Sequence, residues 1–99
     1  MKVPSGSKLG LGFSRAVRVG DMVFVSGCAP IAPDGGVAAP GDVKAQTMRC
    51  LEIIEGALVQ AGADIKDVVR TRVFLTDMSR WKEAGEAHGE VFKDIEPAT

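Results

Sequence analysis

The stretch Ser14–Ser26, which reads SRAVRVGDMVFVS, decides how the first half of the chain folds. Its first six residues show the alternation of apolar and polar side chains that is typical of a strand with one buried face. Gly20 and Asp21 interrupt the alternation, and Met22–Ser26 is a second run rich in β-branched and aromatic residues. Because glycine supplies the positive φ that a tight turn requires, we predict that the two runs pair as a β-hairpin.

A loop and a helix are predicted to follow the hairpin. Residues 27–41 contain three prolines and four glycines, a composition that favours a surface loop. Asp42 is a suitable N-cap, and Gly62 stands where a helix C-terminus favours glycine. Between them, apolar residues recur at spacings of three and four, which predicts an amphipathic helix. These apolar positions are Met48, Leu51, Ile54, Leu58 and Ala61.

The second half of the chain predicts one more strand and one more helix. Residues 68–75 are rich in β-branched and aromatic side chains, which favours a strand that crosses the middle of the sheet. Asp77 or Ser79 can cap a second helix, which Pro97 is expected to end. Its apolar stripe consists of Trp81, Ala84, His88, Val91 and Phe92. The predicted order β-β-α-β-α describes an α+β fold, with two helices on one face of a mostly antiparallel sheet.

The composition indicates one small domain. The chain has 99 residues, of which 45% are hydrophobic and 25% are charged, the balance of an ordinary globular protein. The N-terminal residues carry proline, serine and glycine with little periodicity. We therefore expect residues 1–12 to be a flexible N-terminal arm and residues 13–99 to form the domain.

Charge and cysteine content exclude several classes of protein. A formal net charge of -1 provides no basic field for nucleic acid or anionic lipid. The apolar runs are far shorter than the roughly 20 residues that span a bilayer. Two cysteines and one histidine suit neither a disulfide framework nor a zinc site, so we expect no metal. These features predict a cytoplasmic protein without a nucleic-acid or membrane partner.

Four residues are candidates for chemistry, and each has an ordinary structural explanation as well. Cys28 follows a predicted strand end, where it is either a nucleophile beside a pocket or an inert, half-buried thiol. His88 lies on the apolar face of the second helix, where it is either a packed histidine or a catalytic or ligand-binding one. Arg70 and Arg72 share one face of a strand, which is either solvated or part of a cleft that binds carboxylates.

From Phe13 to Thr99 the chain resembles the Rid family, also called the YjgF or reactive-intermediate deaminase family. The resemblance rests on segments that stand in family order and spacing: Phe13–Val17, Val23–Gly27, Gln46, Ala61–Ala63, Asp67–Val69, Val73–Met78, Phe92 and Pro97–Ala98. It implies a chorismate-mutase-like α+β fold that assembles as a homotrimer. It also implies small-molecule clefts between neighbouring subunits.

The archetypal members of this family, called RidA, are hydrolases of enamine and imine metabolites such as 2-aminoacrylate. They release the 2-keto acid and ammonia without a cofactor, so the resemblance implies none here. The chemistry needs an arginine that grips the substrate carboxylate and a positioned water that adds to the C=N carbon. Deaminating members carry this arginine in a Pro-Ala-Arg motif, whereas this chain has Thr99 after Pro97 and Ala98.

Other positions of the implied substrate-binding site also differ from the archetype. Phe13 replaces a tyrosine, and Gly85 stands where the second helix usually carries asparagine. Gly27 matches the pocket-lining glycine, and Cys28 replaces the polar residue that follows it. The chain is therefore most similar to the subgroup that lacks the catalytic arginine.

The resemblance leaves more than one function open. An imine or enamine hydrolase would use Arg72, Cys28 or His88 in new catalytic roles, with Arg72 as a substitute guanidinium. The alternative is a non-catalytic trimer that binds a small carboxylate metabolite or has a regulatory role. Some relatives are linked to RNA cleavage, which the near-neutral charge disfavours. Because relatives continue beyond the Pro-Ala step, we also expect the chain to be C-terminally incomplete, without the family's final strands.

Overall fold

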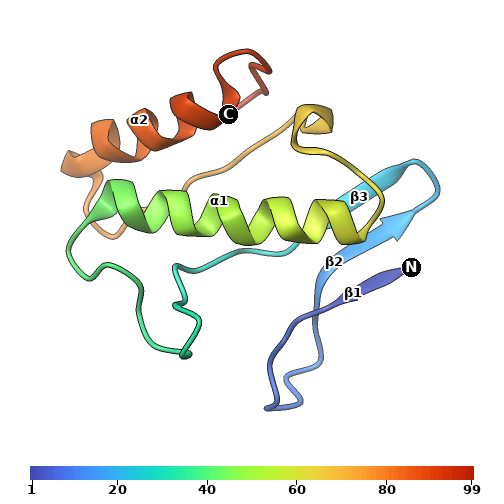
Figure 1. The fold of residues 1–99 in the computed structure, drawn as a ribbon. Helices are drawn as coiled ribbons and strands as arrows, with labels where there is room; N and C mark the ends of the chain where they lie inside the picture. Colours follow the sequence, from blue (N-terminus) through green and yellow to red (C-terminus); the bar gives the residue numbers. More distant parts are fainter.

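A computed structural model describes residues 1–99 as a three-stranded antiparallel sheet and two helices (Figure 1). The strands are β1 (Lys2–Pro4), β2 (Ser14–Val19) and β3 (Met22–Val25), and the helices are α1 (Val43–Gln60) and α2 (Trp81–Phe92). Two short 3₁₀ turns, Ile65–Asp67 and Met78–Arg80, lie between the helices. The predicted α+β class is confirmed.

The predicted hairpin is confirmed. β2 and β3 pair antiparallel from Ala16 opposite Val25 to Val19 opposite Met22, and Gly20 has a φ of 58° in the turn. Ala16 faces α1 and is completely buried. Small alanines on both the strand and the helix let α1 lie close to the sheet.

The first four residues correct part of the expectation of a flexible arm over residues 1–12. Lys2–Pro4 forms the edge strand β1, with Val3 opposite Ala16 on β2. Val3 is only 2% exposed and packs in a cluster with Ala16, Ala57 and Ala61. Three residues that include a proline show no alternation, so the sequence pattern carried no signal for this strand.

Helix α1 begins and ends at the residues that its sequence predicts. The Asp42 carboxylate accepts a hydrogen bond from the Ala45 backbone N–H at 2.9 Å and so caps the first turn. Gly62, with a φ of 80°, follows the C-terminus. The Arg18 guanidinium donates to the Ala61 carbonyl at 2.9 Å, which places a cation at the negative end of the helix dipole.

The predicted central strand over residues 68–75 is not part of the sheet, and this prediction is wrong. The only backbone pairing of the segment is with the chain end, through a parallel bridge between Arg70 and Ala98. Phe74 within it is 86% exposed. The local composition favours an extended backbone, but a strand also requires a neighbouring strand, and β3 ends the sheet on this side.

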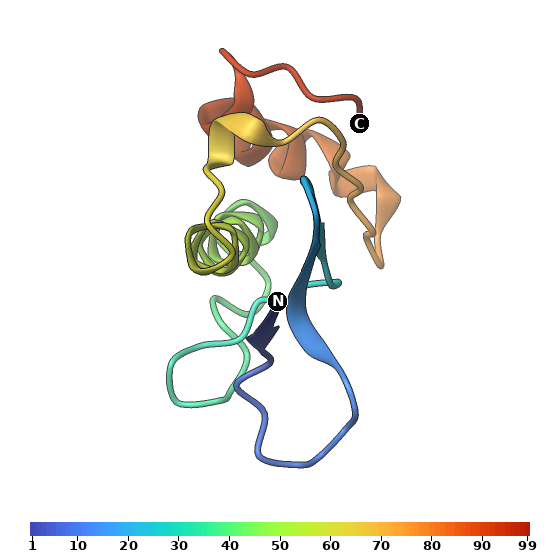
Figure 2. The same ribbon diagram turned by 90° about the vertical axis from the view of Figure 1, so that its right-hand side faces the viewer.

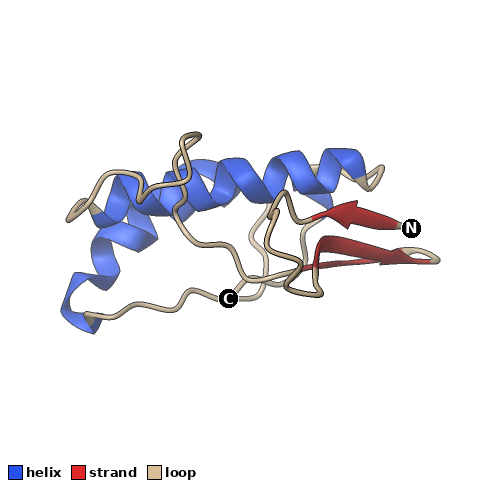
Figure 3. Ribbon diagram, turned by 90° about the horizontal axis from the view of Figure 1, so that it is seen from below, coloured by secondary structure: helices blue, strands red, loops and turns tan.

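Helix α2 packs beside α1. A 3₁₀ turn capped by Asp77 leads into α2. The helix ends at Phe92 rather than continuing to Pro97. Figures 1 and 3 show that the strands and α2 lie toward opposite ends of α1, and Figure 2, which looks along α1, shows α2 stacked above it. Neither helix has the length and apolar composition that crossing a membrane requires.

Candidate functional site

A hollow of about 290 Å³ lies between α2, the extended segment before it and the chain end. We call it the His88 pocket. The His88 imidazole, the Thr99 hydroxyl and the Trp81 indole N–H are the polar side-chain groups of its lining, which is otherwise mostly apolar. The lining residues are Val73, Leu75, Met78, Trp81, Ala84, Gly85, His88 and Thr99. The structure thus brings together three residues that the sequence analysis assigned to a site: Gly85, His88 and Thr99.

Two threonine hydroxyls connect to His88 in this pocket. Thr71 Oγ1 lies 2.9 Å from His88 Nε2 and 2.7 Å from Thr99 Oγ1. Thr99 Oγ1 also donates to the Pro97 carbonyl at 3.2 Å. When Nε2 carries the proton, His88 can donate to Thr71, Thr71 can donate to Thr99, and Thr99 donates to the Pro97 carbonyl. When Nε2 is unprotonated, Thr71 can donate to it, so the network can serve either tautomer.

His88 is both a packed residue and a pocket residue. Its ring lies 4.6 Å from the Phe92 ring, centroid to centroid, and burial lowers its pKa below the usual value. At neutral pH the imidazole is therefore uncharged and able to accept a proton. The two alternatives for His88, packing or chemistry, are thus compatible.

A second cluster forms around Arg15, which the sequence analysis did not single out as a site residue. Arg15 Nη1 donates to the Gly27 carbonyl at 3.0 Å and contacts Cys28 Sγ at 3.5 Å. Its guanidinium carbon lies 5.7 Å from the centre of the Phe13 ring. This Arg15 cluster contains the other three predicted binding residues, Phe13, Gly27 and Cys28. None of them lines the His88 pocket, so one chain holds two separate groups of candidate residues.

Arg72, the predicted substitute guanidinium, joins neither group. Its side chain is exposed and makes no hydrogen bond or ion pair within the chain, although its neighbour Val73 lines the His88 pocket. A larger hollow of about 620 Å³ lies beneath the loop after β1, with Lys2 as its only charged side chain. It contains no group suited to acid-base chemistry at neutral pH, so we assign the candidate site to the His88 pocket and the Arg15 cluster.

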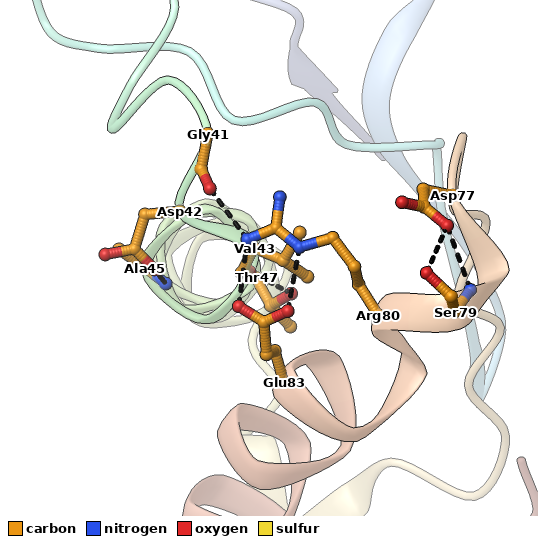
Figure 4. Close-up of polar contacts among 9 residues, drawn as sticks. All are labelled: Gly41, Asp42, Val43, Ala45, Thr47, Asp77, Ser79, Arg80 and Glu83. Atoms are coloured by element: carbon orange, nitrogen blue, oxygen red, sulfur yellow. Dashed lines mark hydrogen bonds and ion pairs between the residues drawn. The ribbon is translucent and has the colours of Figure 1, made fainter.

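Hydrogen bonds and an ion pair of Arg80 hold the start of α2 against the start of α1 (Figure 4). Arg80 pairs with both carboxylate oxygens of Glu83, at 2.8 and 2.9 Å, and donates to the Gly41 carbonyl at 2.7 Å. This pairing lowers the pKa of Glu83. Met78 lies two residues before Arg80, Trp81 directly follows it, and both line the His88 pocket. The contacts of Arg80 therefore help to fix one wall of that pocket.

Comparison with known proteins identifies the family. A family model described as Endoribonuclease L-PSP matches residues 8–99. A RutC family protein of Pyrococcus abyssi is 40% identical over 86 residues, which cover 87% of this chain and 68% of the relative. Protein DfrA of Myxococcus xanthus is 38% identical over 88 residues, which cover 87% of this chain and 67% of DfrA.

Solved structures agree with this identification. A member of the YjgF/YER057c/UK114 family from Mycobacterium tuberculosis is 46% identical, with a TM-score of 0.86 over 100% of this chain and 79% of its own. E. coli TdcF, solved with bound serine, is 28% identical, with a TM-score of 0.81 over 98% of this chain and 76% of its own. From the family match and these likenesses, we conclude that this chain belongs to the endoribonuclease L-PSP family, the group also known as the YjgF, RutC or Rid family.

Proposed function

We propose that this protein hydrolyses small enamine or imine metabolites. These substrates carry a carboxylate, and the products are the keto acid and ammonia. The observation that carries the proposal is the contact between His88 Nε2 and the Thr71 hydroxyl at 2.9 Å, at the edge of a mostly apolar pocket. An uncharged imidazole beside hydroxyl groups can orient one water molecule and accept its proton. Most of the remaining lining is apolar, so few other groups compete to bind that water.

In the proposed reaction, that water adds to the carbon of the C=N bond. The oxygen–carbon bond forms as the C=N π electrons move to nitrogen, which takes up a proton, and His88 accepts a proton from the water. The resulting carbinolamine then loses ammonia and becomes the keto acid. An enamine first gains a proton at carbon to give the imine, and no oxidant or cofactor is needed.

The substrate carboxylate needs a cation, and the His88 pocket has none in its lining. In the proposal, Arg15 supplies it from a neighbouring subunit of a homotrimer. Only Nη1 of Arg15 is bonded within the chain, so the other guanidinium N–H groups remain available to a carboxylate. This arrangement would substitute for the arginine that Thr99 replaces.

Keto-acid release tests this proposal. The protein is incubated with a pyridoxal-phosphate dehydratase acting on serine, which generates 2-aminoacrylate, and keto acid is followed against a no-protein control. We expect faster release with the protein present, and slower release with Arg15→Met than with Arg15→Lys, which retains the charge. Light scattering on the same samples measures the oligomer. A folded trimer that gives no acceleration would refute the proposed hydrolysis.

One observation favours a second candidate, a trimer that binds a metabolite without turnover. Thr99 stands where deaminating relatives carry the clamping arginine, and its hydroxyl is already bonded to Thr71 and Pro97. Serine is the first probe, because the E. coli relative was solved with it bound. Serine at about 100 times its Kd would stabilise the protein by about 2.7 kcal/mol, which a thermal shift detects. Stabilisation together with no keto-acid release would select this candidate.

A further inference from the structure

The two cysteines of the chain lie next to each other, although 22 positions separate them in the sequence. Cys28 follows the end of β3, and Cys50 lies inside α1. Cys50 Sγ donates to the Cys28 carbonyl oxygen at 3.3 Å. Both side chains are half-buried and both thiols are free. The cysteine pair therefore joins the strand end to the helix through a sulfur contact.

The surroundings of the two sulfurs differ. Cys28 Sγ lies 3.5 Å from Arg15 Nη1 and donates to the Ser26 carbonyl at 3.4 Å. A positive charge thus stands beside the sulfur at the strand end. Burial raises the pKa of Cys50. Cys50 consequently stays a protonated thiol at neutral pH.

The separation is short enough for a bond between them. A carbonyl oxygen lies about 2.4 Å from its own Cα, so Cys50 Sγ is within about 6 Å of Cys28 Cα. The Cys50 side chain adds its own length to this distance, so the two Cα atoms lie within about 9 Å of each other. Because a disulfide joins Cα atoms about 4.4 to 6.8 Å apart, closing the bond requires the loop after β3 to move toward α1 by up to about 2 Å, with rotation about the two Cα–Cβ bonds.

We propose that Cys28 and Cys50 form a peroxide-sensitive modification site that closes an intramolecular disulfide between the end of β3 and α1. The Cys28 thiolate attacks one oxygen of hydrogen peroxide, the O–O bond breaks, and hydroxide leaves, which yields a sulfenic acid. The Cys50 sulfur then attacks the Cys28 sulfur, the S–O bond breaks, and the hydroxyl leaves as water with the Cys50 proton. Two thiols are oxidised by two electrons, and one peroxide is reduced to two waters.

The roles of the two cysteines are distinct in this scheme. Cys28 meets the peroxide, because it has the neighbouring guanidinium and the exposed flanking residues Gly27 and Ala29. Cys50 resolves the sulfenic acid, because it already touches the Cys28 backbone. Bond formation moves the Cys28 sulfur toward α1 and so breaks its contact with Arg15.

The test treats the full chain with hydrogen peroxide at a few equivalents, blocks remaining thiols with N-ethylmaleimide, and maps the peptides by mass spectrometry. We expect a Cys28–Cys50 cross-linked peptide within one chain, a loss of two hydrogen masses, and reversal by dithiothreitol. The closed loop should raise the melting temperature by about 15 °C. Disulfides only between chains, or both thiols still free in folded protein, would overturn the proposal.

Two matched variants separate the assigned roles. In Cys50→Ser, dimedone should trap a sulfenic acid on Cys28 at the same peroxide dose. In Cys28→Ser, Cys50 should remain reduced under identical conditions. Equal dimedone labelling of the remaining thiol in both variants would contradict the assignment of Cys28 as the attacking residue. Circular dichroism on each variant verifies that the comparison is made between folded proteins.

Discussion

Val3→Ala is the most direct stability test of the N-terminal strand. Val3 is 2% exposed and packs against Ala16, Ala57 and Ala61, so β1 contributes to the core rather than trailing as an arm. The substitution removes two methyl groups, each contributing about 0.8 kcal/mol by transfer from water. The surrounding alanines are too short to fill the space, and the cavity brings the expected loss to about 2 to 3 kcal/mol.

The measurement is the free energy of unfolding from urea titration, supported by the melting temperature. For a domain of this size, a loss of 2 to 3 kcal/mol lowers the melting temperature by about 10 to 20 °C. Leu9→Ala is the matched control, because Leu9 lies in the following loop and is 78% exposed. It should change stability by less than about 0.5 kcal/mol. Equal effects of the two substitutions would refute the reasoning and support the interpretation of these residues as a flexible arm.

Three further predictions follow from named contacts. Asp42→Ala removes the acceptor of the Ala45 N–H and should cost about 1 kcal/mol in urea unfolding, whereas Asp42→Asn should retain most of the stability. Burial lowers the pKa of His88, so the folded state binds its proton less tightly than the unfolded chain does. Stability should therefore fall as pH falls below about 6.5, and His88→Gln should flatten that dependence between pH 7 and 5. Lys44→Met breaks an exposed ion pair with Glu90 at 2.9 Å and should change the unfolding free energy by less than about 1 kcal/mol; a larger loss at high salt would contradict this.

The elements that sequence reasoning predicted well are those whose signals are local. The β2–β3 hairpin depends on Gly20 between two β-rich runs, and α1 depends on the Asp42 cap and a regular apolar spacing. β1 was missed because Val3 is buried by helix residues more than 50 positions away, which no local pattern reports. Residues 68–75 were assigned to the sheet because their composition favours an extended backbone, yet strand pairing depends on a partner that local composition does not specify.

In the candidate site too, the residues with a local sequence signal were predicted, and those defined by contacts between distant segments were not. His88, Gly85 and Thr99 were named from the helix face and the family resemblance, and the structure brings them to one pocket. Thr71 was missed because a threonine in an extended segment is ordinary, and only its distance from His88 Nε2 places it at the candidate site. Arg15 was missed because a polar residue in an alternating strand is normally solvated. The structure shows it instead against Gly27 and Cys28.

The rate of keto-acid release by His88→Gln, relative to the wild type, tests the central claim most directly. Glutamine can still hydrogen-bond to Thr71 but cannot accept the proton from water, so folding and assembly should survive while catalysis falls. In the dehydratase-coupled assay at pH 7.5, we predict a loss on the order of 100-fold in the protein-dependent rate. Thr71→Val should give a smaller loss, because it removes the hydroxyl that orients the imidazole and leaves the base in place. A His88→Gln trimer that releases keto acid as fast as the wild type would contradict the assignment of His88 as the base.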